Sequence, residues 1–250
     1  MSNKPLKHSE KKKQRQKGTS AASRMKGSWG SPRPSAPTIP VRPERYLIVS
    51  EGTETEPGYF GAIKRLVNAR YHGEYISVIV RGAGMNTLSL FEEAKRIAED
   101  DPEGFTQVWV VYDKDDFPAV DFNAVADRCF SSSTELTSYH AAWSNESFEL
   151  WYLLHFEYQQ AALRRDDYVE LLSTRLTAMG KGRYLKNRSD MYEVLEPLLS
   201  TAVANAKRLA RSNSGKSPAS SNPGTTVHEL VEELLPYAYS TEKRKELKLL

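Results

Sequence analysis

The chain has 250 residues, 39% hydrophobic and 27% charged, enough for one well-packed domain with appendages. No apolar run approaches the roughly 18 residues that span a bilayer, so we expect no membrane association. The first residues are basic and polar, without the apolar segment of a secretory signal. The single cysteine, Cys129, excludes an internal disulfide. Together these features favour a cytoplasmic protein.

Charge is divided unevenly along the chain. Residues 1–45 contain 12 Lys or Arg and two acids, whereas the remaining residues contain 23 basic and 30 acidic side chains. The larger part is therefore acidic and would repel a phosphate backbone unless metal ions or local basic patches intervene. Residues 1–43 are rich in Lys, Ser, Pro and Gly, which predicts a disordered tail. Its basic cluster fits a tether to nucleic acid or an acidic partner as well as a solubilising segment.

Residues 44–158 alternate between strand and helix patterns. Continuous apolar runs, typical of strands buried on both faces, occur at Tyr46–Val49, Tyr75–Val80 and Val108–Tyr112, with a fourth strand expected near 137–143. Helical spacing occurs from about Glu56, at Leu88–Ala98 and over about 119–131. This order predicts an α/β core with a mostly parallel sheet flanked by helices.

The remainder of the chain has mainly helical patterns. The clearest helical segments are 146–158 and 190–211, and the stretch 212–224 is a loop rich in Ser, Pro, Gly and Asn. We therefore expect residues 159–250 to form a helical C-terminal extension packed on the core.

Acidic residues follow two of the expected strands. Glu51 comes directly after the first strand, and Asp113 and Asp115 come directly after the third. If the chain stays extended there, Asp113 and Asp115 point to the same side. Three carboxylates at one edge of a sheet cannot all ionise cheaply without a cation, and Mg²⁺ (or Mn²⁺) suits such ligands. The sequence therefore predicts a metal site at this edge.

Longer segments carry a resemblance to a known family. The segments are VSEGTETEPGYF (49–60), VWVVYDKDDF (108–117), SNESFELWYLLHFE (144–157) and SNPGTT (221–226). Together they resemble the RloB family, Toprim-like proteins of prokaryotic defence and restriction-associated loci, over about residues 45–235. The resemblance implies a Toprim-like fold, Glu51 as metal ligand or general acid/base, and Asp113 and Asp115 as Mg²⁺ ligands. It also implies an ATPase partner.

Three further acids are candidate metal ligands. Asp116 is an alternative helix cap, and Glu56 lies in the first turn of a helix, where an acid favours the dipole. Glu149 lies in an apolar segment, so it should be exposed, paired with a cation or bound to metal. The turn Arg81–Gly84 resembles a phosphate cradle only weakly, and a plain strand-to-helix turn is favoured.

A basic cluster near the middle of the extension is the candidate nucleic-acid surface. It comprises Lys181, Arg183, Lys186 and Arg188, with Tyr184 as a candidate stacking ring. A solvated helical connection explains the same residues almost as well.

These features predict a Mg²⁺-dependent nuclease that cleaves DNA or RNA in phage defence, with Glu51, Asp113 and Asp115 as catalytic residues. The alternative is a non-catalytic regulatory or binding subunit that uses its carboxylates for metal-bridged docking. Hydrolysis of a small nucleotide phosphate ester is a third hypothesis.

Overall fold

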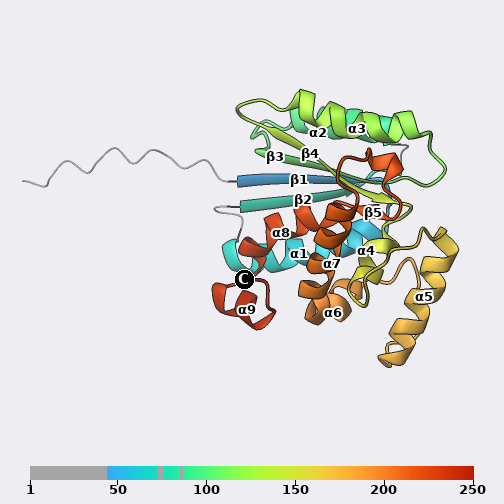
Figure 1. Cartoon of the computed structure of the whole chain (residues 1–250). Helices are drawn as coiled ribbons and strands as arrows, with labels where there is room; N and C mark the ends of the chain where they lie inside the picture. The colour runs from blue at the N-terminus through green and yellow to red at the C-terminus, as the bar shows by residue number, and fades with distance from the viewer. Residues whose placement is uncertain (1–43, 73–75, 85–86) are drawn as a thin grey trace, which may run out of the picture. The chain divides into compact units, whose positions relative to one another are not determined.

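A five-stranded sheet forms the centre of the fold (Figure 1). The computed structural model describes residues 44–72, 76–84 and 87–250. The strand order is β2-β1-β3-β4-β5. The strands are β1 (Glu44–Ser50), β2 (Ile76–Gly82), β3 (Gln107–Asp113), β4 (Ser138–Asn145) and the short β5 (Gly224–Thr225). The first four are parallel and β5 is antiparallel to β4, which confirms the predicted mostly parallel α/β fold.

Two expectations fall on residues that the structure does not describe. The predicted tail at 1–43, with its basic cluster, lies outside the described residues, and so does Tyr75, which was expected to begin the second strand. The other expected strands agree with the observed bounds to within a few residues.

The register of the strands brings their carboxyl ends together. Ser50 at the end of β1 is paired with Gly82 on one side and with Val111 on the other. Because the strands are parallel, the residues that follow β1 and β3 emerge at the same edge of the sheet. This alignment determines where Glu51 and Asp113 lie.

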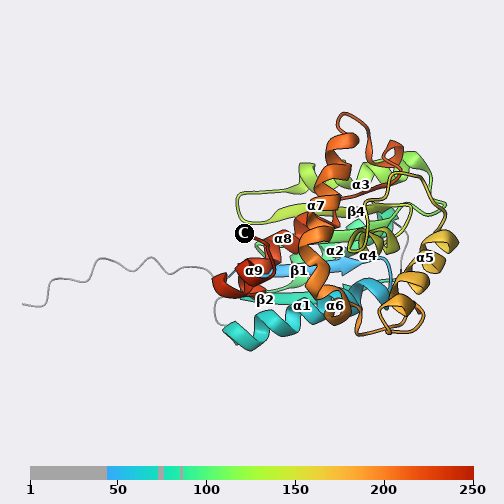
Figure 2. The ribbon, with the colours of Figure 1, turned by 60° about the horizontal axis from the view of Figure 1, so that its bottom comes forward.

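Helices cover both faces of the sheet (Figures 1 and 2). One face carries α2 (Thr87–Asp100) and α3 (Ala119–Ser132), and the other carries α1 (Thr55–Tyr71) and α8 (Val227–Ala238). Successive strand residues alternate between two buried clusters: Ile48 and Val111 pack on the α1 side, whereas Val49 and Val110 pack on the α2 side. Burial on both faces explains why these strands are continuous apolar runs.

The predicted helical C-terminal region is present, with more breaks than expected. Besides α8, its helices are α4 (Glu149–Leu154), α5 (Arg165–Ala178), α6 (Met191–Leu195), α7 (Leu199–Ser212) and α9 (Thr241–Glu246). The helix expected at 146–158 is shorter at both ends, since α4 begins at Glu149 and ends at Leu154. The segment 190–211 is divided by a short 3₁₀ turn that contains Pro197.

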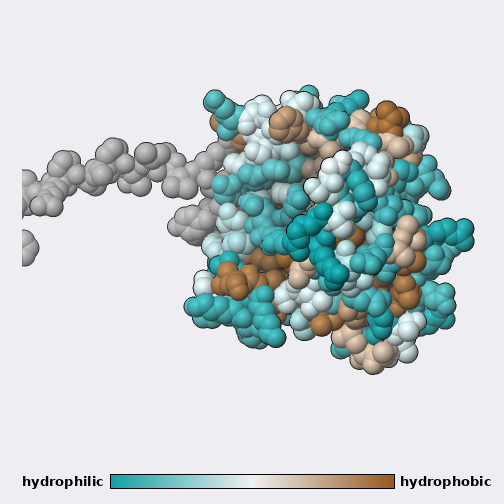
Figure 3. Space-filling model, viewed as in Figure 1, coloured by the Kyte–Doolittle hydropathy of each residue, from teal (hydrophilic) through white to brown (hydrophobic). Residues whose placement is uncertain are grey.

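Among the described residues, none of the helices combines the length and the apolar character needed to cross a membrane. The face drawn in Figure 3 is mostly hydrophilic, and its apolar residues form small separate groups.

Candidate active site

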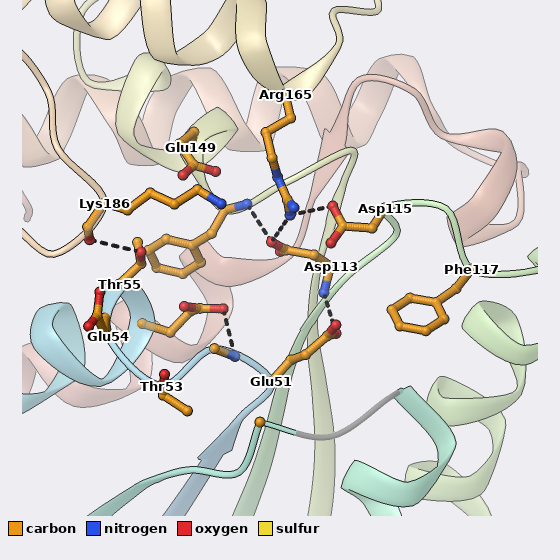
Figure 4. A pocket seen from close by; sticks show the side chains of 14 residues that line it. Glu51, Thr53, Glu54, Thr55, Asp113, Asp115, Phe117, Glu149, Arg165 and Lys186 are labelled. Carbon is orange, nitrogen blue, oxygen red and sulfur yellow. Dashed lines mark hydrogen bonds and ion pairs between the residues drawn. The ribbon is translucent and has the colours of Figure 1, made fainter.

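The carboxyl ends of β1 and β3 open into a pocket of about 500 Å³ (Figure 4). The loop between β1 and α1, the end of β3, and the first residues of α4 and α5 all contribute to its walls. The charged side chains that line it are Glu51, Glu54, Glu56, Asp113, Asp115, Glu149, Arg165 and Lys186. The structure thus brings the three principal predicted metal ligands, Glu51, Asp113 and Asp115, to one pocket.

Asp113 is the most firmly held of these acids. Its side chain is buried at the end of β3, and its Oδ2 accepts a hydrogen bond of 3.1 Å from the backbone N–H of Phe148. Its backbone N–H lies 3.5 Å from Oε2 of Glu51, to which it donates. Its Oδ1 is buried without a hydrogen-bond partner among the described residues. A buried acceptor that lacks a donor is costly, which is the condition that a bound cation relieves.

Burial and neighbouring negative charges raise the pKa values of Glu51 and Asp113. Burial raises the pKa of Glu51 to about 7, and the negative charges of Asp115 and Glu56 act in the same direction. Burial also holds the pKa of Asp113 well above its usual range, with further contributions from Glu56, Glu149 and Asp115. The cluster therefore resists full ionisation at neutral pH unless a positive charge joins it.

Asp115 reaches the pocket by a different route from the one expected. The chain does not stay extended after Asp113, because it turns at Asp115, whose φ is +36°. The expectation that strand alternation aligns the two side chains is therefore wrong. Both acids nevertheless face the same guanidinium: Nη2 of Arg165 forms an ion pair with Oδ1 of Asp115 and lies 3.5 Å from Oδ2 of Asp113.

Glu56 and Glu149 are two further buried acids that line the same pocket. Glu56 is buried in the first turn of α1, and its Oε1 accepts a 3.3 Å hydrogen bond from the N–H of Gly52. A Cβ atom at Gly52 would lie 2.2 Å from Oε2 of Glu56, so the glycine leaves the room that this carboxylate needs. Glu149 is 3% exposed and accepts a 3.0 Å hydrogen bond from the hydroxyl of Tyr184. Both candidate ligands therefore lie in the pocket wall.

The remaining acid, Asp116, lies further out. It is exposed and lines a neighbouring pocket together with Glu51, Asp115 and Arg165. This position is beside the main pocket and away from the buried Asp113, so Asp116 is the least favourably placed of the candidate ligands.

The predicted basic cluster is divided by the structure. Lys186 lines the pocket, and Figure 4 shows its side chain extending toward Glu149. Arg188 forms an ion pair with Asp190, whereas Lys181 and Arg183 are exposed outside the pocket. The expectation of a stacking ring at Tyr184 is wrong, because this ring is 3% exposed and its hydroxyl is bonded to Glu149.

The turn after β2 does not offer its backbone to a phosphate. The N–H of Ala83 donates to the carbonyl of Ser50, and the N–H of Gly84 donates to the carbonyl of Glu51. These bonds support the plain strand-to-helix turn that was favoured over a phosphate cradle. They also fix the loop that presents Glu51.

The donor set fits a hard divalent cation. Carboxylate oxygens are the ligands that Mg²⁺ and Mn²⁺ prefer, and the bare Oδ1 of Asp113 lies among them. As the side chains stand, however, no three carboxylate, histidine or cysteine groups within residues 44–72, 76–84 and 87–250 converge closely enough to enclose an ion. The guanidinium of Arg165 supplies the positive charge between Asp113 and Asp115 instead.

Arg165 is the site residue that sequence reasoning missed. It is about 50 residues from the acids it contacts, at the start of a helix whose existence was predicted only in outline. In the sequence, an arginine followed by two aspartates at the start of a helix indicates only local interactions with the helix dipole and between neighbouring charges. Its contact with the β3 acids arises from the path of the chain between α4 and α5.

The buried charge of Glu56 leads to a stability prediction. Burial, and then the negative charge of Glu149, raises the pKa of Glu56 above its unfolded value of about 4.5. Ionised Glu56 therefore destabilises the native state, fully so above its native pKa. We expect Glu56→Gln to raise the free energy of unfolding of the metal-free protein at pH 8 by about 1–2 kcal/mol.

Urea unfolding with EDTA present, followed by circular dichroism, measures this gain. The gain should shrink as the pH falls toward 4.5, where wild-type Glu56 is protonated in the native state. Glu54→Gln is the matched control, because Glu54 is exposed in the same loop and should change the stability little. A loss of stability in Glu56→Gln at pH 8 would show that the ionised carboxylate is well compensated.

A family model described as RloB-like protein matches residues 46–234, which is more than half of the chain. No curated protein and no solved structure matches the chain. The matched range includes most of β1, all of β3 and the first turns of α4 and α5, and thus the charged residues of the pocket. The chain belongs to the family of RloB-like proteins.

Proposed function

We propose that this protein is a divalent-metal-dependent nuclease of prokaryotic phage defence that hydrolyses phosphodiester bonds in DNA or RNA. The observation that carries the proposal is the meeting of Glu51, Asp113 and Asp115 in one pocket, with Oδ1 of Asp113 unpaired. The proposed role in phage defence is based on the resemblance of the chain to the RloB family and on its match to the family model.

Glu51, Asp113 and Asp115 would hold Mg²⁺ or Mn²⁺, and Glu56 and Glu149 would add negative charge behind them. A divalent ion in such a site activates water and neutralises charge on a phosphodiester. The Phe148 N–H fixes one oxygen of Asp113, and the other oxygen, Oδ1, has no hydrogen-bond partner among the described residues. Gly52 has no side chain, which leaves room for the carboxylate of Glu56.

Glu51 is placed to handle the proton. It is only half-buried, it lines both the main pocket and the neighbouring one, and it receives the Asp113 N–H on one oxygen. A carboxylate near the pocket mouth accepts a proton from attacking water at its other oxygen. Lys186 contributes positive charge on the opposite wall, where the phosphate backbone of the substrate would approach.

Cleavage assays on the purified chain test the proposal. Supercoiled plasmid, single-stranded DNA and RNA are incubated with Mg²⁺ or Mn²⁺, with EDTA, and with EDTA followed by excess Mn²⁺. We expect cleavage of at least one substrate with the metals, none with EDTA, and recovery after Mn²⁺ is restored. Undiminished cleavage in EDTA would contradict a metal-dependent mechanism.

Calorimetric titration with Mn²⁺, combined with these cleavage assays, separates this proposal from the non-catalytic alternative. A protein that binds Mn²⁺ but cuts none of the substrates, alone or with its partner, would be the regulatory or binding subunit. We propose an ATPase encoded alongside as that partner, on the strength of the family resemblance alone. Co-purification with the product of such a neighbouring gene, followed by the same cleavage assay with ATP, tests this part.

A further inference from the structure

Arg165 holds a position that a metal ion would need. Its Nη2 forms an ion pair with Oδ1 of Asp115 and lies 3.5 Å from Oδ2 of Asp113, the two acids at the end of β3. Figure 4 shows the guanidinium between these carboxylates, reaching down from the start of α5. The side chain therefore acts as a counter-charge to both acids.

A divalent ion bound to Asp113 and Asp115 would lie close to the Arg165 guanidinium, which contacts the same two carboxylates. A guanidinium next to the ion would be repelled by two positive charges at close range, in surroundings where burial weakens solvent screening. Binding of metal to Asp113 and Asp115 should therefore release the Arg165 head group from both acids.

The released side chain has room and unused donors. The Arg165 side chain is 34% exposed, and its Nε is buried without a hydrogen-bond partner among the described residues. It lines the pocket opposite Glu51, with Lys186 as the other cation of the lining. A guanidinium presents a rigid fork of N–H groups that matches two oxygens of a phosphate.

We propose that Arg165 is a switching residue that pairs with Asp113 and Asp115 in the metal-free site and with the scissile phosphate once the metal is bound. This inference rests on the proposed function and deepens it. Metal and phosphodiester substrate then bind cooperatively, because each removes a charge that opposes the other. Arg165 competes with the metal when substrate is absent and supports the substrate when metal is present.

The two roles predict opposite effects of one substitution. In Arg165→Gln, we expect the affinity for Mn²⁺ without nucleic acid to rise several-fold, about three- to tenfold, because the competing cation is gone. We expect the affinity for an oligonucleotide in Ca²⁺, which replaces Mg²⁺ in binding without supporting cleavage, to fall about tenfold. The slope of log affinity against log salt should become smaller by about one unit, as one phosphate contact is lost.

Two further variants make the test specific. Arg165→Lys keeps the charge without the fork, so it should bind Mn²⁺ like the wild type and the oligonucleotide with intermediate affinity. It also serves if Arg165→Gln does not fold. Arg175→Gln is the matched control, because Arg175 lies on the same helix and pairs with Glu157 outside the pocket. It should match the wild type in both measurements.

The outcomes distinguish the inference from the proposed function. If Arg165→Gln keeps the wild-type oligonucleotide affinity and salt slope, or binds Mn²⁺ more weakly, the switching role is wrong even though the wild type remains a metal-dependent nuclease. If the wild type neither binds Mn²⁺ nor cuts nucleic acid, the proposed function itself fails. A gain in metal affinity together with a loss in oligonucleotide affinity supports the inference.

Discussion

Replacement of Asp113 by Asn, or of Glu51 by Gln, is expected to lower metal-dependent cleavage by about 100- to 1,000-fold or more. Both substitutions preserve the shape of the side chain and remove its negative charge. An Asn at position 113 can still accept the Phe148 N–H through its Oδ1, so the local packing should be kept. The loss of cleavage would therefore be due to the lost charge in the pocket and not to a change in the fold.

The two variants should differ in metal affinity. Asp113 is buried with one oxygen unpaired, so Asp113→Asn should weaken Mn²⁺ binding strongly in calorimetry. Glu51 is half-buried at the mouth, and a role in proton transfer predicts that Glu51→Gln loses more in kcat than in metal affinity. Equal losses in both quantities would assign Glu51 to metal binding alone.

Matched controls lie elsewhere on the surface. Asp127→Asn on α3 and Glu135→Gln in the loop before β4 make the same chemical changes at exposed positions outside the pocket. Both should cleave at the wild-type rate. If Asp113→Asn and Glu51→Gln also cleave at the wild-type rate, the pocket is not the catalytic centre and the nuclease proposal is wrong.

The sheet could be predicted well from the sequence because the burial of each strand is visible in its residue composition. Strands β1 and β3 are buried on both faces, so each is an unbroken apolar run that ends at a polar residue. The same logic located Glu51 and Asp113, since residues that follow parallel strands share one edge. The short antiparallel strand β5 was not predicted, because its two residues pair only through the distant contact with β4.

The parts of the site that depend on long-range packing were not predictable. The basic residues next to Tyr184 in the sequence suggested an exposed ring. In the structure the ring is buried, and its hydroxyl donates to the carboxylate of Glu149. The contact of Arg165 with Asp115 depends in the same way on how α5 returns to the sheet. Both residues come from the helical region, where a helical pattern specifies a face but no partner across the fold.

The acidic pocket rests on a buried aromatic cluster, and Tyr59 lies at its centre. The Tyr59 ring lies within 5.1–6.4 Å, between centroids, of five other rings, and it is 2% exposed. The five rings are those of Phe60, Phe148, Trp151, Tyr152 and Tyr192. We expect Tyr59→Ala to lower the free energy of unfolding by about 3–5 kcal/mol, as buried aromatic truncations do.

Two links connect this cluster to the chemistry of the pocket. Tyr59 is one helical turn after Glu56 on α1, and the Phe148 ring that packs on it belongs to the residue whose N–H holds Asp113. A cavity at position 59 should therefore loosen both carboxylates and weaken Mn²⁺ binding as well as the fold. Tyr59→Phe keeps the ring and should cost at most about 1 kcal/mol, with wild-type metal affinity.

Urea unfolding and Mn²⁺ calorimetry on the same two variants check this link. If Tyr59→Ala is destabilised by the expected amount but binds Mn²⁺ as tightly as the wild type, the carboxylates do not depend on this packing for their positions. If it is destabilised by less than about 1 kcal/mol, the aromatic cluster is not close-packed. Loss of both stability and metal affinity, with neither changed in Tyr59→Phe, is the expected result, because the same side chains that fill the core also hold the backbone that aims Asp113.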